Sequence, residues 1–332
     1  MTATLAALEI DPAAEVSRIR DALREQLATS LKRRGLVVGM SGGVHSSVCA
    51  ALAVEAVGAK HVLGLFMPER ESDPESLTIA RSFAEQLGID SVTEDIATVL
   101  YGAGCYRRRN EAIRRVVPEF TDEWGCKLVL PPDRLEADRL NITYLVVQPP
   151  RGELRRVRLP APEYWQIVAA SNFKQRVRTM FEYYHADRLH YAVVGTPNRL
   201  EYDQGFFVKG GDGLADVKPI AHLYKTQVYR LADYLGVPAS STSRPPTTDT
   251  FSIPHSQEEF YYNMPTSTLD VVLHARNEGR PASDVAEEIG FTVEQVQRAY
   301  GDIDQKRMTT RYLHLGPQLV ETVTLGSSAG KV

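Results

Sequence analysis

The sequence is poor in features that would place it in a specialised class of protein. Three cysteines in 332 residues (Cys49, Cys105 and Cys126) are too few for a disulfide framework, which favours a reducing compartment. No apolar run approaches the roughly 18 residues that a membrane-spanning helix needs. Residues 1–20 carry acids among alanines and lack the basic-then-apolar order of a signal peptide. These absences argue against a disulfide-rich, secreted or membrane-spanning protein and predict a cytoplasmic one.

An excess of charge of one sign is also missing. The 38 basic and 42 acidic residues give a formal net charge of −4, so no overall basic excess points to nucleic acid. Residues 284–296 superficially resemble a helix-turn-helix, but Glu294 and the lack of positive charge before Arg298 suit DNA phosphates poorly. We therefore expect a protein that binds neither nucleic acid nor a membrane.

Strand-like and helix-like segments alternate along most of the chain. The hydrophobic pattern predicts helix 16–32, strand 36–40, helix 46–56, strand 62–67, helix 76–87, strand 91–96, helix 166–185, strand 189–195 and helix 225–235. Such alternation is typical of an α/β protein with a doubly wound parallel sheet flanked by helices. Ligands of these sheets bind beyond the carboxyl ends of the strands.

The breaks in this rhythm predict the domain organisation. We expect a main domain over residues 1–260, a helical extension over 261–325 built around 269–275 and 285–300, and a disordered tail over 326–332. An insertion at about 102–160 interrupts the main domain. It contains two extended runs, 141–148 and 154–159, which predict a β-hairpin.

The most informative segment is the turn between the first strand and its helix, which contains Met40, Ser41, Gly42, Gly43 and Ser46. A tight strand–turn–helix joint directs backbone N–H groups and the positive end of the helix dipole at one point, which suits a phosphate. The two glycines let the backbone approach a ligand closely, and the two serines add hydroxyl donors. The sequence therefore predicts a phosphate-binding loop here.

This loop resembles the Ser-Gly-Gly-x-Asp-Ser loop of the PP-loop ATP pyrophosphatases, whose fold is adenine nucleotide alpha hydrolase-like. Further segments extend the resemblance, in order, at 171–178, 195–201, 205–216, 224–227 and 246–249. Together they resemble the ammonia-dependent NAD synthetases. The likeness covers about residues 30–100 and 165–260 and leaves out the insertion.

The resemblance implies an ATP-dependent ligase that adenylylates a carboxylate, deamido-NAD in the family, and transfers ammonia to it with release of AMP and pyrophosphate. It implies ATP and Mg²⁺ as co-substrate and cofactor, a small-molecule carboxylate and ammonia as partners, a homodimer and a role in NAD biosynthesis. It assigns ATP binding to Met40, Ser41, Gly42, Gly43, His45, Ser46, Arg176, Thr196, Lys225 and Thr247. It assigns substrate binding to Asn172, Lys209, Asp212 and Asp216, the metal to Glu201, and catalysis to Lys225, Glu201 and His45.

One position departs from the family loop, because His45 stands where the family has aspartate. Mg²⁺ prefers oxygen ligands, so an imidazole is a poor substitute for a carboxylate. An imidazolium could instead donate to phosphate directly, or ATP turnover could be lost or weakened. We favour retained nucleotide binding because the other ATP-facing motifs persist. Loss of turnover would leave a non-catalytic nucleotide-binding protein as an alternative.

The insertion is the second departure and leaves the acid substrate open. Because it falls where the family builds part of its acyl-substrate region, a paralogue that amidates another acid is an alternative, such as a nucleotide-sugar acid or a natural-product carboxylate. Arg107, Arg108 and Arg109 form either an anion site or, more commonly, a solvated helix face. Cys105 and Cys126 lack the close spacing of a zinc site. No glutaminase domain precedes the loop, so we expect free ammonia, an amine or ammonia from a separate partner as the nitrogen donor.

Overall fold

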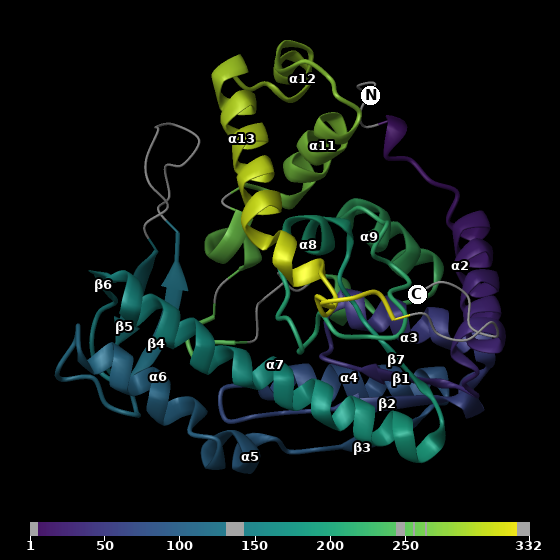
Figure 1. The fold of residues 1–332 in the computed structure, drawn as a ribbon, viewed down its shortest axis with the longest axis horizontal. Helices are drawn as coiled ribbons and strands as arrows, with labels where there is room; N and C mark the ends of the chain where they lie inside the picture. The colour runs from purple at the N-terminus through teal and green to yellow at the C-terminus, as the bar shows by residue number, and fades with distance from the viewer. Residues whose placement is uncertain (1–5, 131–142, 244–249, 255, 263, 324–332) are drawn as a thin grey trace.

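A four-stranded parallel sheet forms the centre of the molecule (Figure 1). The computed structural model describes residues 6–130, 143–243, 250–254, 256–262 and 264–323. In the sheet the strands lie in the order β3 (Asp90–Thr93), β2 (Val62–Phe66), β1 (Leu36–Gly39) and β7 (Ala192–Val194). Leu36 pairs with Val62 on one side and with Ala192 on the other. The strand order therefore reverses at β1, which places the ligand crevice of a doubly wound sheet beyond the end of β1.

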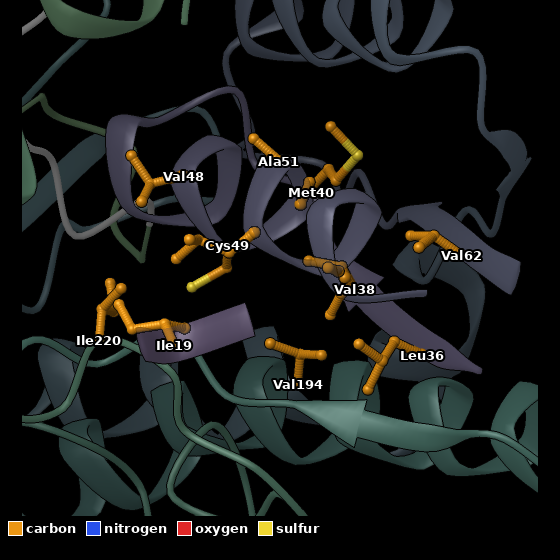
Figure 2. Close-up of a cluster of buried hydrophobic side chains, with 14 of the residues drawn as sticks. Ile19, Leu36, Val38, Met40, Val48, Cys49, Ala51, Val62, Val194 and Ile220 are labelled. Carbon is orange, nitrogen blue, oxygen red and sulfur yellow. The ribbon is translucent and has the colours of Figure 1, made fainter. Parts of the chain in front are cut away.

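Helices cover both faces of this sheet, as the strand–helix alternation predicts. One face carries α2 (Pro12–Gln26), α3 (Val44–Val57), α4 (Pro74–Leu87) and α9 (Lys225–Tyr234), and the other carries the long α7 (Ala161–Leu189). The side chains of successive residues in β1 point alternately to the two faces of the sheet. Leu36 and Val38 join the larger core with Ile19 and Cys49 (Figure 2), whereas Val37 packs toward α7.

Local capping chemistry explains where several helices begin and end. The side chains of Asp11 and Asp73 cap α2 and α4, and a proline follows each of them at the first helical position. Gly88 ends α4 in the left-handed conformation. The predicted helix 16–32 proves to be two pieces, α2 and a π-helical turn, η1 (Leu27–Leu31). The predicted helices and strands of the main sheet are confirmed, with their ends shifted by a few residues.

The inserted segment folds as its own small layer. It follows α5 (Ala97–Gly102) and contains α6 (Cys105–Arg114) and an antiparallel sheet of β4 (Gly125–Val129), β5 (Tyr144–Gln148) and β6 (Arg155–Arg158). The predicted hairpin is confirmed as β5 and β6, but β4 is a third strand that the sequence pattern did not reveal. Apolar side chains of α6, β4, β5 and the start of α7 share one core, so the insertion is packed against the main domain.

The C-terminal helices form a second layer above the sheet's carboxyl edge (Figure 1). They are α11 (Thr266–Asn277), α12 (Ala282–Ile289) and α13 (Val293–Thr310), followed by η4 (Arg311–His314). Gly290 adopts a φ of 71° and splits the expected single helix 285–300 into α12 and α13. Their apolar faces share a core with Leu200 of α8 (Arg199–Gln204), so the resemblance to a helix-turn-helix reflects internal packing.

The remaining short elements are η2 (Ala59–His61), α10 (Ala239–Thr242) and η3 (Glu258–Tyr262). The tail predicted over 326–332 lies outside the described residues, and so does Thr247. Within the described ranges, no helix combines the length and the apolar character needed to cross a bilayer.

Candidate active site

The turn after β1 has the conformation that a phosphate-binding loop requires. Gly42 adopts a φ of 80°, and a Cβ atom at this position would lie 2.5 Å from the carbonyl oxygen of Ser76. Ser46 Oγ donates to the Gly43 carbonyl (3.0 Å) and accepts from the Ser41 N–H (3.2 Å). Ser46 therefore holds the loop closed, while the α3 N-terminus, where Gly43 is the N-cap without a side-chain partner, faces the adjoining cleft.

A cleft of about 1630 Å³ opens at this loop. Its walls come from the loop, the ends of β1 and β2, one side of α7, the 205–212 segment and the C-terminal end of α13. Single small-molecule pockets usually measure about 300–1,000 Å³, so this cleft has room for two nucleotide-sized ligands. The insertion forms part of the wall and leaves this space open.

His45 faces Glu201 and Asn198 across the cleft wall. The Asn198 Oδ1 atom accepts from the Glu201 N–H (3.0 Å), which fixes the orientation of the amide and directs its Nδ2 donor to His45 Nε2 (3.0 Å). Nε2 must therefore accept, so the proton lies on Nδ1, which is 3.7 Å from Glu201 Oε1. This assignment of the tautomer follows from the hydrogen-bond network.

The same geometry corrects the interpretation of His45 as an imidazolium that donates to phosphate. The side chain is only 14% exposed. Burial lowers the pKa of His45 below its ordinary value, and Lys225 adds to this effect while Glu201 opposes it. With Nε2 engaged by Asn198, the ring is a neutral group that connects the phosphate loop to α8.

Glu201 is held in place by backbone and side-chain donors. Its Oε2 accepts from the Asn198 N–H (2.9 Å), which completes a capping box at the start of α8. Its Oε1 accepts from Gln257 Nε2 (2.9 Å), and Gln257 Oε1 in turn accepts from Lys225 Nζ (3.1 Å). Gln257 thus bridges the two residues expected to bind metal and phosphate. Sequence reasoning missed it because it lies 56 positions from Glu201 and in no recognisable motif.

Among the residues predicted to bind ATP, Lys225 has the surroundings least suited to contact with a phosphate group. Its side chain is buried at the start of α9, and its backbone N–H donates to Asp270 (3.2 Å). Burial lowers its pKa, against the opposing charges of Glu201 and Asp270. Lys225 does not line the cleft in the described part of the chain, and Gln257 stands between it and Glu201.

Most other predicted site residues border the cleft. Those that line it are Met40, Ser41, Gly42, Gly43, His45, Ser46, Asn172, Arg176, Thr196, Glu201, Lys209 and Asp212. Lys209 Nζ donates to the carbonyls of Tyr312 (2.7 Å) and Leu315 (2.8 Å), so its ammonium group is hydrogen-bonded to the segment that follows α13. Asp216 instead accepts from the Val193 N–H (2.7 Å) at the sheet and is not among the lining residues.

One carboxylate that was not predicted, Glu182, lines the cleft and interacts with the predicted Asp212. Burial raises the pKa of Glu182 to about 7, and the nearby charge of Asp212 adds to the rise. Burial raises the pKa of Asp212 to about 6, although the Val208 N–H donates to it (2.8 Å). Glu182 belongs to α7 and approaches Gly39 at the end of β1, so this pair lies beside the phosphate loop.

The donor set suits Mg²⁺ that is bound largely by its nucleotide. The described residues contain no cluster of three or more His, Cys, Asp or Glu side chains arranged to hold a metal by themselves. Mg²⁺ commonly takes one or two carboxylates and completes its shell with phosphate oxygens and water. Glu201 lines the cleft next to His45 of the loop and fits this role.

A buried ion network supports the cleft from the side of the insertion. Lys174 Nζ donates to Glu69 Oε1 (2.7 Å), Glu71 Oε2 (2.8 Å) and the Thr250 carbonyl (2.8 Å). Arg109 forms a bidentate pair with Glu71 (2.7 and 2.8 Å). Burial alone would raise the pKa of Glu71, but Arg109 and Lys174 outweigh it and hold that pKa well below its ordinary value.

This network shows that the three consecutive arginines of the insertion do not share one role. Arg109 is a buried structural cation, whereas Arg107 is exposed and pairs with Glu111 (2.9 Å). Arg109 is therefore neither on a solvated helix face nor free to bind an anionic ligand, because it pairs with the internal carboxylate of Glu71.

The comparisons with known proteins agree with this geometry. A sequence model of the NAD synthase family matches residues 15–112 and 155–311. An NH(3)-dependent NAD(+) synthetase of Rhizobium meliloti (strain 1021) is 56% identical over 316 residues, 95% of this chain and 94% of the relative. One of Mesorhizobium japonicum is 57% identical over 312 residues, 94% of this chain and 98% of the relative.

Solved structures share the fold at low sequence identity. An NH3-dependent NAD synthetase from Campylobacter jejuni has a TM-score of 0.61 at 18% identity and covers 94% of this chain and 100% of its own. An NMN synthetase from Francisella tularensis has a TM-score of 0.58 at 21% identity, with 96% and 100% covered. Both likenesses concern the fold alone.

The comparisons also bear on the two departures. The segment that the family model leaves out is 113–154, narrower than the predicted 102–160. An alignment that covers 95% of the chain cannot omit a segment of this length, so the R. meliloti relative shares most of it. The insertion is therefore no sign of a different acid substrate, and the alternatives of a paralogue or a non-catalytic protein receive no support.

Proposed function

The chain belongs to the NAD synthase family, and from that membership we propose that it amidates deamido-NAD with ammonia, using ATP and releasing AMP and pyrophosphate. The observation that carries the proposal is the tight glycine turn after β1, which lies at the head of a cleft large enough for ATP and a second nucleotide. As a family member it is a ligase that forms C–N bonds and uses ATP and Mg²⁺.

The residues of the loop supply the first part of the reaction. A carboxylate becomes a good electrophile only when one of its oxygens can leave, and transfer of AMP to that oxygen provides this. The α3 N-terminus, Ser41 and Ser46 would bind the phosphates that leave as pyrophosphate. Glu201 would hold Mg²⁺, which neutralises charge on the phosphates. A fixed array of this kind accelerates transfer by alignment and by charge stabilisation.

Thr196, Asn172 and Asp212 would position the two substrates along the cleft walls. Lys225 would act through Gln257, by holding the side chain that in turn orients Glu201. A homodimer remains a prediction of the family resemblance, and a cytoplasmic location remains a prediction from the composition of the sequence.

The proposal is tested by assaying the purified protein with ATP, Mg²⁺, ammonium and deamido-NAD. NAD, AMP and pyrophosphate should appear in equal amounts, because one adenylylation precedes each amide. Omitting ammonium should leave NAD formation at background. Ordinary turnover of a different nucleotide acid, without turnover of deamido-NAD, would contradict the proposed substrate.

Replacing His45 with aspartate tests the departure in the loop. The substitution should increase Mg²⁺-dependent pyrophosphate release several-fold, because it places a second carboxylate beside Glu201, and Mg²⁺ prefers oxygen ligands. The measurement is the Mg²⁺ dependence of the initial rate. His45→Asn, which adds an oxygen without charge, is the matched control. Loss of the reaction in His45→Asp would show instead that the imidazole has acquired its own catalytic role.

A further inference from the structure

The inserted sheet is connected to the cleft by the described residues between 250 and 262, which we call the strap. β4 is an edge strand of that sheet, and the strap is hydrogen-bonded along its outer edge. The Cys126 N–H donates to Ser252 Oγ (2.9 Å), and the Cys126 carbonyl accepts from the N–H of the residue after Ser252 (3.3 Å). The Leu130 N–H donates to the Glu259 carbonyl (3.0 Å). The strap therefore takes its position from the inserted sheet.

The main domain and the C-terminal layer hold the strap at its two ends. The Thr250 carbonyl accepts from Lys174 Nζ (2.8 Å), which belongs to the buried ion network. At the other end, Tyr261 Oη donates to the Gln204 carbonyl (2.7 Å), and the Tyr261 carbonyl accepts from Lys306 Nζ (2.8 Å). Protein groups from three parts of the fold thus fix the position of the strap.

Gln257 lies between these attachments, and its buried amide has only one orientation that satisfies its neighbours. An ammonium group such as Lys225 Nζ only donates, so the amide atom that faces it at 3.1 Å is the oxygen. The Nε2 donor then faces Glu201 Oε1 at 2.9 Å. The Asn198 N–H donates to the other carboxylate oxygen (2.9 Å). A carboxylate has about four lone-pair sites, so both Glu201 oxygens keep capacity for a cation.

We propose that Gln257 is a positioning residue for Mg²⁺ binding and that the inserted sheet, through the strap, sets its place. Gln257 holds the Glu201 carboxylate in one orientation at the cleft wall, where it can meet a nucleotide-bound cation. Hydrogen-bond partners of metal-binding carboxylates strengthen metal binding because they orient the ligand in advance. This inference rests on the proposed function, in which Glu201 holds Mg²⁺. It gives the inserted sheet a part in the reaction that needs no contact with the acid substrate.

Calorimetric titration of the full chain with ATP, once with Mg²⁺ and once with EDTA, tests the role of Gln257. Gln257→Met keeps the length of the side chain and removes both of its hydrogen bonds. The variant should reduce the Mg²⁺-dependent gain in ATP affinity by about tenfold, the lower end of the range for loss of such a partner. The ATP affinity in EDTA should stay within about twofold of the wild type, because the loop after β1 is unchanged.

Gln227→Met is the matched control for the loss of a buried glutamine. Gln227 is similarly buried, but its amide bonds to the backbone of Leu8 (3.1 Å) and of Tyr224 (2.9 Å), and it does not line the cleft. Both variants should lose stability, because each removes two hydrogen bonds from the interior. Only Gln257→Met should change the response of ATP binding to Mg²⁺.

Ser252→Ala tests the contribution of the inserted sheet at an exposed position, so it stays informative if Gln257→Met folds poorly. It removes the acceptor of the Cys126 N–H and should reduce the Mg²⁺-dependent gain by about two- to fivefold, because the other attachments of the strap remain. Arg155→Ala, on β6 at the opposite edge of the same sheet, is its control and should have no effect. In the variant with both Ser252→Ala and Gln257→Met the two effects should not add, because both act through Glu201.

The outcomes separate this inference from the proposed function. An unchanged Mg²⁺-dependent gain in Gln257→Met, or an equal loss in Gln227→Met, overturns the role of Gln257. A loss in Gln257→Met without any loss in Ser252→Ala overturns the role of the inserted sheet. If the wild type shows the gain but does not amidate deamido-NAD, the proposed substrate fails and the inference stands. If the wild type amidates deamido-NAD but its ATP affinity does not depend on Mg²⁺, the inference fails and the proposed function stands.

Discussion

Replacing Lys174 with methionine should lower the free energy of unfolding by about 3–5 kcal/mol, the usual cost of removing one partner from a buried ion network. Lys174 is fully buried and neutralises Glu69 and Glu71, so its loss leaves an uncompensated carboxylate in the interior. The Thr250 carbonyl also loses its donor. Urea unfolding followed by circular dichroism measures the change.

A control and a double variant make this result specific. Arg107→Met removes an exposed pair with Glu111, four residues along the same helix α6, and should cost at most about 0.5 kcal/mol. Adding Glu69→Gln to Lys174→Met should restore part of the stability, because it removes the stranded charge. Equal losses in Arg107→Met and Lys174→Met would contradict the structural role of the network.

The network should also make stability fall on acidification. The pKa of Glu71 is held below its ordinary value of 4.5 in the folded chain. Its stabilisation is therefore complete above that pH and is lost as the pH falls toward the folded value. Lys174→Met should reduce this dependence, since Lys174 is one of the two cations that hold the pKa down.

Replacing Gly42 with alanine should reduce kcat/KM for ATP by about a hundredfold, the size of effect that a misplacement near 1 Å produces at a reacting centre. Two causes act together. The φ of 80° is unfavourable for a residue with a Cβ atom, and that atom would meet the Ser76 carbonyl at 2.5 Å, so the loop must shift. Initial rates and calorimetric titration with ATP measure the effect.

Gly88→Ala is the control that distinguishes the backbone strain of a positive φ from displacement of the loop by a steric clash. Gly88 has a φ of 67°, but no atom lies within 4 Å of its added Cβ position. This variant should lose about 1 kcal/mol of stability and keep its ATP affinity. If Gly42→Ala binds ATP as tightly as the wild type, the turn after β1 is not the phosphate site.

The order of apolar runs, glycine turns and helical patterns along the chain was enough to predict the main parallel sheet and its helices. Gly35 and the apolar run before Met40 predict β1, and Ser41, Gly42 and Gly43 predict the turn after it. These features depend on residues close together in the sequence. The third strand of the inserted sheet escaped prediction because β4 is recognisable only by its pairing with β5, which lies in a separate segment of the chain.

The sequence by itself determined the glycine turn after the first strand, the parallel sheet and the family, because each is encoded by short-range patterns of glycine, serine and apolar residues. Only the tertiary structure decided the state of His45, the bridging role of Gln257 and the pairing of Arg109 with Glu71. A side chain's charge and partners depend on burial and on residues tens of positions away, which no local pattern specifies.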